Sequence, residues 1–460
     1  MEKTITQNIA EIVIKTKFDD LPEYAVNHAK KLTLDLLGSM IGTRDVITSK
    51  IAREISEEMG GPAEATIVGS EIKVNVPNAA FANAIQCYGL DYVDDHNESN
   101  SHPSPATYPA SLAISEHLKK NGKEFIEAVV LGNEIVCRMG RAYLGEMYYQ
   151  GFHPTSTCGT MGVAVSAAKL YNLDEDGIVN SLGIAGSMVS GLMAWNSTGA
   201  FSKRLQAGHP AMNSVIAARM AEKGFTGPSD IFEGKDGLLH AYSYRDTYDA
   251  NSITDKLGEE WIFADSSIKV YPCCRYSGGH IDACLEIVNK YNPNPEEIEK
   301  IHIRSSKYTM RLLAEDKKWN PKNIVDLQFS MPYQAAIAFK NGKVTVEEFD
   351  ERYIKDSLIK RLIAATTVVM DEEFERRYPE HYSSAVTITM KDGTEYTAVV
   401  DDPKGDKRNP VTYEEVIEKF RNLVKPIYKD EERIQKIIDY VNNLEKQTNI
   451  ADLIKLLNEK

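Results

Sequence analysis

Apolar residues in the first half of the chain recur at steps of three and four positions. The pattern extends from Thr4 to about Glu222 and is clearest over residues 21–41, 79–90 and 106–118. This spacing places the apolar side chains on one face of an amphipathic helix. Glycine and alanine crowd several of these stretches, which lets helix backbones approach closely and leaves room for a ligand. We therefore expect an all-helical unit in this half.

Near Ile268 the pattern changes to one that favours strands. Residues 300–305 alternate apolar and polar side chains, and residues 385–400 do the same on both sides of Asp392-Gly393, a typical hairpin turn. Helical spacing occupies the stretches between these strands, at 281–291 and 328–339. Strands interleaved with helices in this way predict an α+β unit with an antiparallel sheet.

The last part of the chain returns to helical spacing. A charged connector at 401–410 precedes a helical pair over 413–457, which we expect to pack back on the first unit. The predicted fold is therefore mainly α. It has an all-helical domain over 1–266, an inserted α+β domain over 267–404, and C-terminal helices over 405–460 that rejoin the helical domain.

Composition narrows the classes of partner. The 460 residues exceed what one hydrophobic core usually supports, and the net charge is −14 with lysines and arginines scattered singly. This balance argues against nucleic acid or an anionic membrane as a partner, and an anionic substrate would need local cations. Six cysteines without framework spacing, and no apolar run of membrane-spanning length, indicate free thiols in a cytoplasmic protein.

The densest chemistry lies between Leu90 and Pro103. Five side chains in this segment can move protons or bind a metal, and they should lie in a loop after an apolar helix. A solvated acidic helix end is the plainer interpretation. A metal site lacks the usual ligand spacing. The five residues are Asp91, Asp94, Asp95, His96 and His102.

Two further motifs open helices rich in small residues. In the first, His153 follows a glycine-containing turn, and Thr155 or Ser156 can cap the helix, whose free amide groups favour an anion. In the second, Lys203 and Arg204 stand where they can hold a carboxylate. A histidine that only satisfies a turn, and cations that only face solvent, remain the alternatives.

A fourth motif occupies residues 269–282. Cys273 and Cys274 are too few ligands for a zinc site, although a cysteine beside Arg275 can have its thiolate favoured. His280 adds a titratable group a few residues later.

In this order the motifs resemble the MmgE/PrpD family, which includes 2-methylcitrate dehydratase and cis-aconitate decarboxylase. The resemblance extends over most of the chain and does not identify one substrate. It rests on Leu90-Asp91-Tyr92 through His102-Pro103-Ser104, Gly151-Phe152-His153-Pro154, Lys203 with Gly208, Gly224 to Pro228, Tyr271-Pro272-Cys273 with His280 and Asp282-Ala283, and Ser330-Met331-Pro332-Tyr333.

The resemblance implies a homodimer of two-domain subunits, in which the α+β unit is a lid and the active site lies between lid and helical domain. It implies no metal and no organic cofactor. The decarboxylase pattern matches Asp91, His102, His153, Lys203 and Tyr308. The decarboxylase pattern differs from this chain at two positions. Cis-aconitate decarboxylase has threonine at the position of His96 and histidine at the position of Cys274. These departures weigh against cis-aconitate as the substrate.

We therefore expect a cofactor-independent lyase that acts on a small di- or tricarboxylate, most simply a dehydratase of a 2-methylcitrate-like acid. His102 and His153 would form the acid/base pair, with Asp91 as the orienting carboxylate. Lys203 and the lid residue Tyr308 would complete the catalytic set. Substrate contacts would come from His96, Arg204, Cys274, Arg275 and His280, and Lys203 would also hold a substrate carboxylate. Asp94 and Asp95 are expected to be structural. Decarboxylation, epimerisation of an amino- or iminodicarboxylate, and non-catalytic carboxylate binding remain alternatives.

Overall fold

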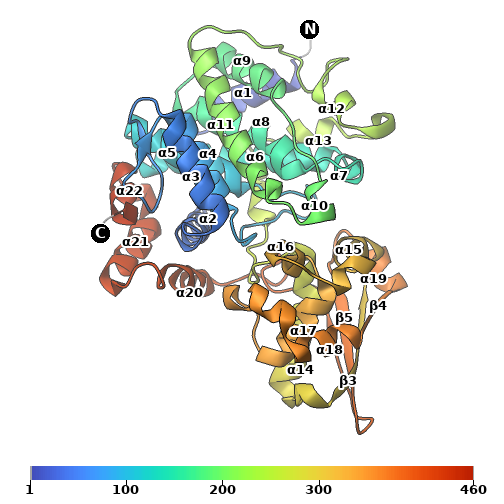
Figure 1. Ribbon diagram of the computed structural model, residues 1–460. Helices are drawn as coiled ribbons and strands as arrows, with labels where there is room; N and C mark the ends of the chain where they lie inside the picture. The colour runs from blue at the N-terminus through green and yellow to red at the C-terminus, as the bar shows by residue number, and fades with distance from the viewer. Residues whose placement is uncertain (1–2, 459–460) are drawn as a thin grey trace.

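The chain forms two hydrophobic cores, one in a helical unit and one in a smaller α+β unit below it (Figure 1). The structure is a computed structural model and describes residues 3–458. The first core collects side chains from Ile9 to Ile268 and again from Val411 to Leu457. The second collects side chains from Cys273 to Ala398, together with Trp195. The C-terminal segment thus packs on the helical unit, as the hydrophobic pattern predicts.

The helical unit contains the first thirteen α-helices and the last three, plus a two-stranded antiparallel pair that the sequence pattern did not reveal. Its elements are α1 (Ile5–Lys15), α2 (Glu23–Gly42), α3 (Ile47–Met59), β1 (Ala65–Thr66), β2 (Lys73–Val74), α4 (Val76–Cys87), α5 (Ser104–Leu118), α6 (Gly122–Ala142), α7 (Glu146–Tyr149), α8 (Pro154–Leu170), α9 (Glu175–Gly186), α10 (Trp195–Thr198), α11 (Ser202–Glu222), α12 (Leu238–Ala241), α13 (Asn251–Thr254), α20 (Tyr413–Val424), α21 (Glu431–Asn442) and α22 (Ala451–Asn458).

Small residues determine how closely the central helices pack. Gly208 of α11 faces α4, where a Cβ atom would lie 2.5 Å from Ile85 Cγ1 and 3.0 Å from the Phe81 carbonyl oxygen. Any larger side chain at this position would push the two helices apart. The close approach brings the start of α11 beside the loop that follows α4, where the candidate site lies.

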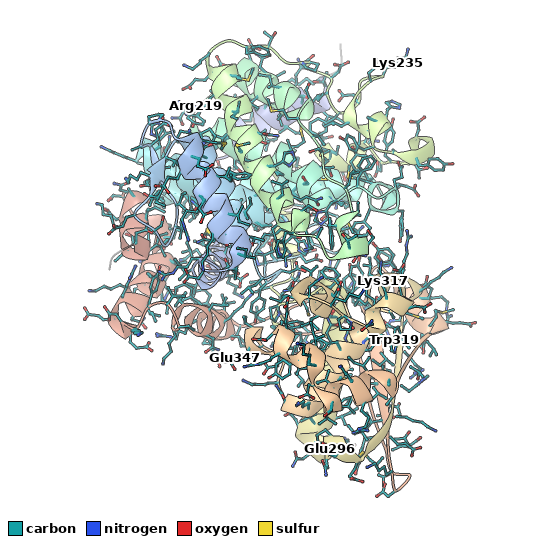
Figure 2. All side chains as sticks on the ribbon, viewed as in Figure 1. Arg219, Lys235, Glu296, Lys317, Trp319 and Glu347 are labelled. Carbon is teal, nitrogen blue, oxygen red and sulfur yellow. The ribbon has the colours of Figure 1, made fainter. Side chains whose placement is uncertain are left out.

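The α+β unit, which we call the lid, contains α14 to α19 and β3 to β6. Its sheet has the order β4-β3-β5-β6, and α14 packs on β5 and β6. Figure 2 shows Trp319 and Lys317 near its boundary with the helical unit and Glu296 toward its far end. The elements are α14 (Gly278–Tyr291), β3 (Ile298–Ser305), α15 (Lys307–Leu313), α16 (Ile324–Gln328), α17 (Met331–Asn341), α18 (Ser357–Ala364), β4 (Thr366–Met370), α19 (Glu372–Arg377), β5 (Ser384–Met390) and β6 (Glu395–Val400).

The fold class is as predicted, with two corrections of detail. The sheet is mixed rather than antiparallel, because β4 pairs with β3 in parallel, while β3–β5 and β5–β6 are antiparallel. The parallel pair is joined through intervening helices, and a crossover of this kind leaves no short-range turn signal in the sequence. The expected C-terminal helical pair is in fact three helices, α20 to α22.

Two chain segments connect the units and lie side by side. The outgoing segment passes through Ser267 and Ile268, and the returning one passes through Gly405, whose carbonyl accepts a hydrogen bond from the Ile268 amide at 3.2 Å. Gly405 has φ +92°, and a Cβ there would lie 2.1 Å from the Ile268 carbonyl oxygen. The residues at which each domain begins and ends stay predictions.

Two sequence-based expectations about the whole chain can be compared with the structure. All six cysteines are free and buried, as their spacing indicated. No helix within residues 3–458 combines the length and apolarity needed to cross a bilayer.

Candidate active site

The motifs singled out in the sequence converge on a cavity between the helical unit and the lid. The space that water can enter is about 30 Å³, little more than a water molecule requires. A larger ligand can enter only after side chains that line the cavity move. The cavity is lined by Asp91, Asp95, Asn100, His102, Tyr148, His153, Trp195, Lys203, Cys274, Arg275, Tyr276 and Phe329.

Asp91 anchors the cations of this cavity. Helix α4 ends at Cys87, and Asp91 lies in the following turn with φ +55°, a conformation that costs energy for any residue with a Cβ. Its Oδ1 accepts hydrogen bonds from Lys203 Nζ at 2.7 Å and Lys269 Nζ at 3.2 Å. Burial raises the pKa of Asp91, but the two lysines outweigh it and hold that pKa well below its usual range.

Lys203 is buried and has two fixed partners. Besides Asp91, its Nζ donates to the Tyr88 hydroxyl at 2.7 Å and lies 4.1 Å from the centre of the Tyr88 ring. Burial lowers the pKa of Lys203 to about 7, with Asp91 opposing the shift and the cations Arg204 and Lys269 adding to it. A lysine with this pKa can hold a carboxylate or exchange a proton near neutral pH.

His102 faces the cavity with its Nε2 atom. Its Nδ1 donates to the Asp94 carbonyl oxygen at 2.7 Å, which fixes the proton of the neutral ring on Nδ1 and leaves a lone pair on Nε2. Nε2 lies 4.0 Å from Asp91 Oδ1. Burial, together with Lys269 and Lys203, lowers the pKa of His102 well below its usual value. His102 is therefore a neutral base at physiological pH.

His153 is held in the same way from the other side of the cavity. Its ring centroid lies 6.4 Å from that of His102, and its Nδ1 donates to Gln206 Oε1. The amide group of Gln206 cannot turn round, because its Nε2 donates to the Leu192 carbonyl oxygen at 2.6 Å. Burial lowers the pKa of His153 to about 3, with Lys203 contributing. The second histidine also presents an unprotonated Nε2 to the cavity.

The helix that follows His153 is not capped as the sequence predicted. His153 itself is the N-cap residue of α8 and makes no side-chain cap bond. The Thr155 hydroxyl instead accepts a hydrogen bond from the His102 amide at 3.0 Å, so it ties the two histidine segments together.

Gln206 offers a direct test of the His153 geometry. In Gln206→Glu, a carboxylate would accept the Nδ1 proton and stabilise the imidazolium, so the pKa of His153 should rise from about 3. Because a base works only when unprotonated, activity at low pH should fall relative to the parent protein while activity at high pH is retained. NMR titration of His153 and a pH–rate profile measure both effects, with the exposed Gln435→Glu as a control. An unchanged His153 titration would contradict the assigned contact.

The lid forms the remaining wall with Cys274 and Arg275. Burial raises the pKa of Cys274 to about 12, so this residue is a neutral thiol and not a thiolate nucleophile. The Arg275 guanidinium donates to Asp406 Oδ2 at 2.8 Å and to the Ser267 hydroxyl at 3.2 Å. Arg275 is thus a cation held in place by the returning connector.

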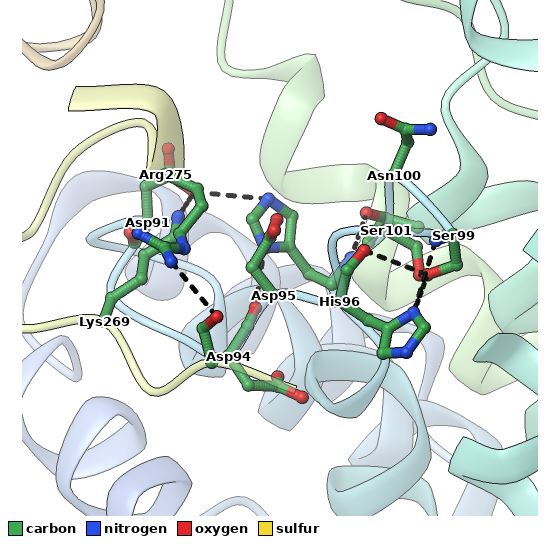
Figure 3. Close-up of polar contacts among 12 residues, drawn as sticks. Asp91, Asp94, Asp95, His96, Ser99, Asn100, Ser101, Lys269 and Arg275 are labelled. Atoms are coloured by element: carbon green, nitrogen blue, oxygen red, sulfur yellow. Dashed lines mark hydrogen bonds and ion pairs between the residues drawn. The ribbon is translucent and has the colours of Figure 1, made fainter. Parts of the chain in front are cut away.

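Four residues expected at the site do not line the cavity. Figure 3 shows His96 turned toward Ser99, and its Nδ1 lies 3.0 Å from the Ser99 hydroxyl. Arg204 donates to Gln328 Oε1 at 2.7 Å, behind the cavity wall. The other two residues are His280, which bonds Gln334 at 3.1 Å inside the lid, and Tyr308, which packs in a cluster of tyrosines between the units.

Asp95 takes the place that was expected for His96. Asp95 lines the cavity, and its backbone pairs with Ser267 of the outgoing segment. Asp94, by contrast, accepts hydrogen bonds from the Ser104 hydroxyl at 2.7 Å and the Ser104 amide at 3.3 Å, at the start of α5. The sequence led us to expect that Asp94 and Asp95 are both structural residues. Only Asp94 has such an environment.

Comparison with protein-family models identifies the chain. Residues 7–251 match the MmgE/PrpD N-terminal domain, and residues 271–444 match the MmgE/PrpD C-terminal domain. The chain belongs to the MmgE/PrpD family. The resemblance inferred from the motifs is therefore confirmed.

Named relatives are similar to this chain over most of their length. The cis-aconitate decarboxylase-like protein oryM of Aspergillus oryzae is 26% identical over 99% of this chain and 98% of its own. Cis-aconitate decarboxylase of Aspergillus terreus is 26% identical over 99% of this chain and 96% of its own. A 2-methylcitrate dehydratase of Salmonella typhi is 22% identical over 82% and 81%.

Within this MmgE/PrpD site, sequence reasoning passed over three contributors that need the fold to be recognised. Asp95 was judged structural, Gln206 had no assigned role, and Lys269 was quoted only as part of the lid motif. Lys269 contacts Asp91 across 178 positions of sequence, and Gln206 contacts His153 across 53. No local pattern reports such distant pairs.

The MmgE/PrpD cavity thus combines two unprotonated imidazole nitrogens with buried cations. In residues 3–458, no group of three or more His, Cys, Asp or Glu side chains is arranged to hold a metal ion. The arrangement of the chain's own groups is suited to removing a proton from a carbon next to a carboxylate, because a base and a cationic surround are both present.

Proposed function

We propose that this protein is a cofactor-independent lyase that acts on a small di- or tricarboxylate. Within that class we propose dehydration of a hydroxy acid resembling 2-methylcitrate or citrate. The observation that carries the proposal is the pair of buried neutral histidines, His102 and His153, whose Nε2 lone pairs face one cation-walled cavity.

In the proposed reaction His102 Nε2 removes the proton α to a substrate carboxylate. Lys203 bonds Asp91 Oδ1, the atom that lies 4.0 Å from His102 Nε2, and stabilises the enolate-like charge that develops, while Arg275 offers a fixed charge for a second carboxylate. Asp91 holds Lys203 in place and remains ionised. Loss of the hydroxyl group from the adjacent carbon then forms the double bond.

Decarboxylation of a cis-aconitate-like acid is the second candidate. It is favoured by the relatives that match this chain over 99% of its length, which are named as decarboxylases. The same cations would hold its carboxylates. The cavity differs from the decarboxylase pattern at Cys274, where that pattern has a titratable histidine, and this difference supports dehydration as the first choice.

We also propose that the protein forms a homodimer, as the family resemblance implies. The α3 helix carries four exposed apolar residues at every fourth position: Ile47, Ile51, Ile55 and Met59, which are 54%, 47%, 42% and 51% exposed. An apolar row of this kind is a typical subunit contact. Light scattering should give the mass of two chains, and the mass of one would contradict the proposal.

The proposed activity can be tested by NMR in D2O. The protein is incubated with citrate, 2-methylcitrate, cis-aconitate and aminodicarboxylates, and each product is read directly. We expect a hydroxy acid to lose water. Loss of CO2 from cis-aconitate would favour the second candidate, and exchange of the α-hydrogen alone would identify an epimerase. Stabilisation by a ligand without any turnover would indicate a carboxylate-binding protein instead.

A further inference from the structure

The cavity contains one carboxyl group that the chain leaves without a hydrogen-bond donor. Asp91 is held by two lysines, Asp94 by Ser104, and Asp406 by Arg275 and Asn97. Within residues 3–458 no group donates a hydrogen bond to the Asp95 carboxyl. His102 Nδ1 lies 3.3 Å from Asp95 Oδ1 but directs its proton to the Asp94 carbonyl oxygen.

The backbone holds this carboxyl in place. The Asp95 amide donates to the Ser267 carbonyl oxygen at 3.0 Å, and the Ser267 amide donates to the Asp95 carbonyl oxygen at 2.7 Å. The Asp95 side chain is 10% exposed. A buried carboxyl that lacks donors is costly to ionise, so it keeps its proton to a higher pH than an ordinary aspartic acid.

The charged groups around Asp95 are consistent with a raised pKa for its carboxyl group. Burial raises the pKa of Asp95 to about 6, Lys269, Arg275 and Lys203 oppose the rise, and Asp91 adds to it. Of the groups packed around it, His102 is neutral and Tyr148 and Tyr382 have pKa values raised by burial. With a pKa of about 6, Asp95 keeps its proton in slightly acidic solution and in a minority of molecules at neutral pH, beside imidazoles that are neutral.

The proposed reaction needs a group that holds a proton from the start, and the neutral histidines hold none on the nitrogen that faces the cavity. The ring protons of His102 and His153 lie on Nδ1 and are held by the Asp94 carbonyl oxygen and by Gln206 Oε1. Lys203 Nζ donates hydrogen bonds to Asp91 and to Tyr88. Burial raises the pKa values of Tyr148, Tyr276 and Cys274, which makes these cavity-lining groups weaker acids than Asp95.

We propose that Asp95 is the general acid of the reaction, a role that rests on the proposed lyase function. His102 Nε2 takes the proton of the breaking α C–H bond, whose electron pair forms the double bond. The C–O bond to the leaving hydroxyl breaks, and that oxygen takes the Asp95 proton and departs as water. His102 then loses its extra proton to solvent and Asp95 takes one up, which restores both groups.

Asp95→Asn tests this role, because the amide keeps the shape but cannot donate an acidic proton. We expect kcat for elimination to fall about 10²- to 10⁴-fold. Deuterium should still enter the α position of recovered substrate in D2O, since His102 is untouched. The parent enzyme should lose elimination activity as pH rises above the pKa of Asp95, because the acid must be protonated, and this limb should disappear in the variant. Glu98→Gln, an exposed change in the same loop, is the control.

Three outcomes would overturn the assignment. The first is unchanged elimination in Asp95→Asn. The second is an equal loss of exchange and elimination, which would make Asp95 a positioning residue for His102, and the third is an Asp95 carboxyl that is already ionised well below pH 6. Infrared difference titration of the parent against Asp95→Asn measures this last property without any substrate. Failure of the proposed function looks different, since the parent protein would then turn over none of the four acid types.

Discussion

His102→Gln should reduce turnover about 10²- to 10⁴-fold without unfolding the protein. Glutamine can still donate to the Asp94 carbonyl oxygen, but it brings no basic nitrogen to the cavity. Unlike Asp95→Asn, this variant should lose the α-hydrogen exchange as well as the elimination, because the first proton transfer itself is blocked. The comparison of the two variants therefore separates base from acid.

The measurement is kcat for the substrate identified by NMR, together with deuterium incorporation in D2O. Circular dichroism and thermal unfolding should match the parent protein, because the ring makes few other polar contacts. His302→Gln, which changes a histidine on β3 of the lid far from the cavity, should have full activity. Parent-like turnover in His102→Gln would remove this residue from the mechanism.

Asp91→Asn should produce the largest loss of stability among the site variants. The change leaves Lys203 and Lys269 buried without their shared anion, and breaking a buried ion pair in this way costs about 3–5 kcal/mol. Asparagine tolerates the positive φ of this position, so the backbone adds little to the loss. Because Lys203 already has a pKa of about 7, it can give up its proton, which places the loss near the lower end of this range.

The pH dependence of this loss has a definite sign. In Asp91→Asn the pKa of Lys203 should fall below the parent value of about 7, so between these two values the folded parent holds a proton that the folded variant lacks. The deficit should therefore shrink as pH rises through this window and be smaller at pH 8 than at pH 6. Urea unfolding at both values measures it.

A matched surface variant distinguishes burial from charge alone. Asp401→Asn removes the partner of Arg377, but that pair is largely exposed and should contribute at most about 1 kcal/mol. Equal losses in Asp91→Asn and Asp401→Asn would contradict the buried-anchor role of Asp91.

Local sequence patterns were sufficient for most of the fold. Helical spacing over 21–41 corresponds to α2 (Glu23–Gly42), and the alternation at 300–305 corresponds to β3, where Ile301 and Ile303 are buried. The Asp392-Gly393 turn joins β5 to β6 as expected. These signals are short-range, because amphipathic periodicity and turn chemistry act between near neighbours.

The site was predictable in its composition but not in its contacts. Asp91, His102, His153, Lys203, Cys274 and Arg275 were named from motifs, and all six line the cavity. His96 was named on the same grounds as Asp95, yet successive side chains of an extended segment point to opposite sides. Which of the two faces the cavity depends on the pairing of Asp95 with Ser267.

The sequence by itself thus determined the helical and α+β units, the family resemblance and the motifs that supply the acid, base and cationic groups. Only the tertiary structure decided their protonation. The Nδ1 proton of each histidine is fixed by an acceptor that packing brings to it, and burial without a donor raises the pKa of Asp95 to about 6. A pKa depends on solvent exclusion and on charges distant in sequence, and these exist only in the folded chain.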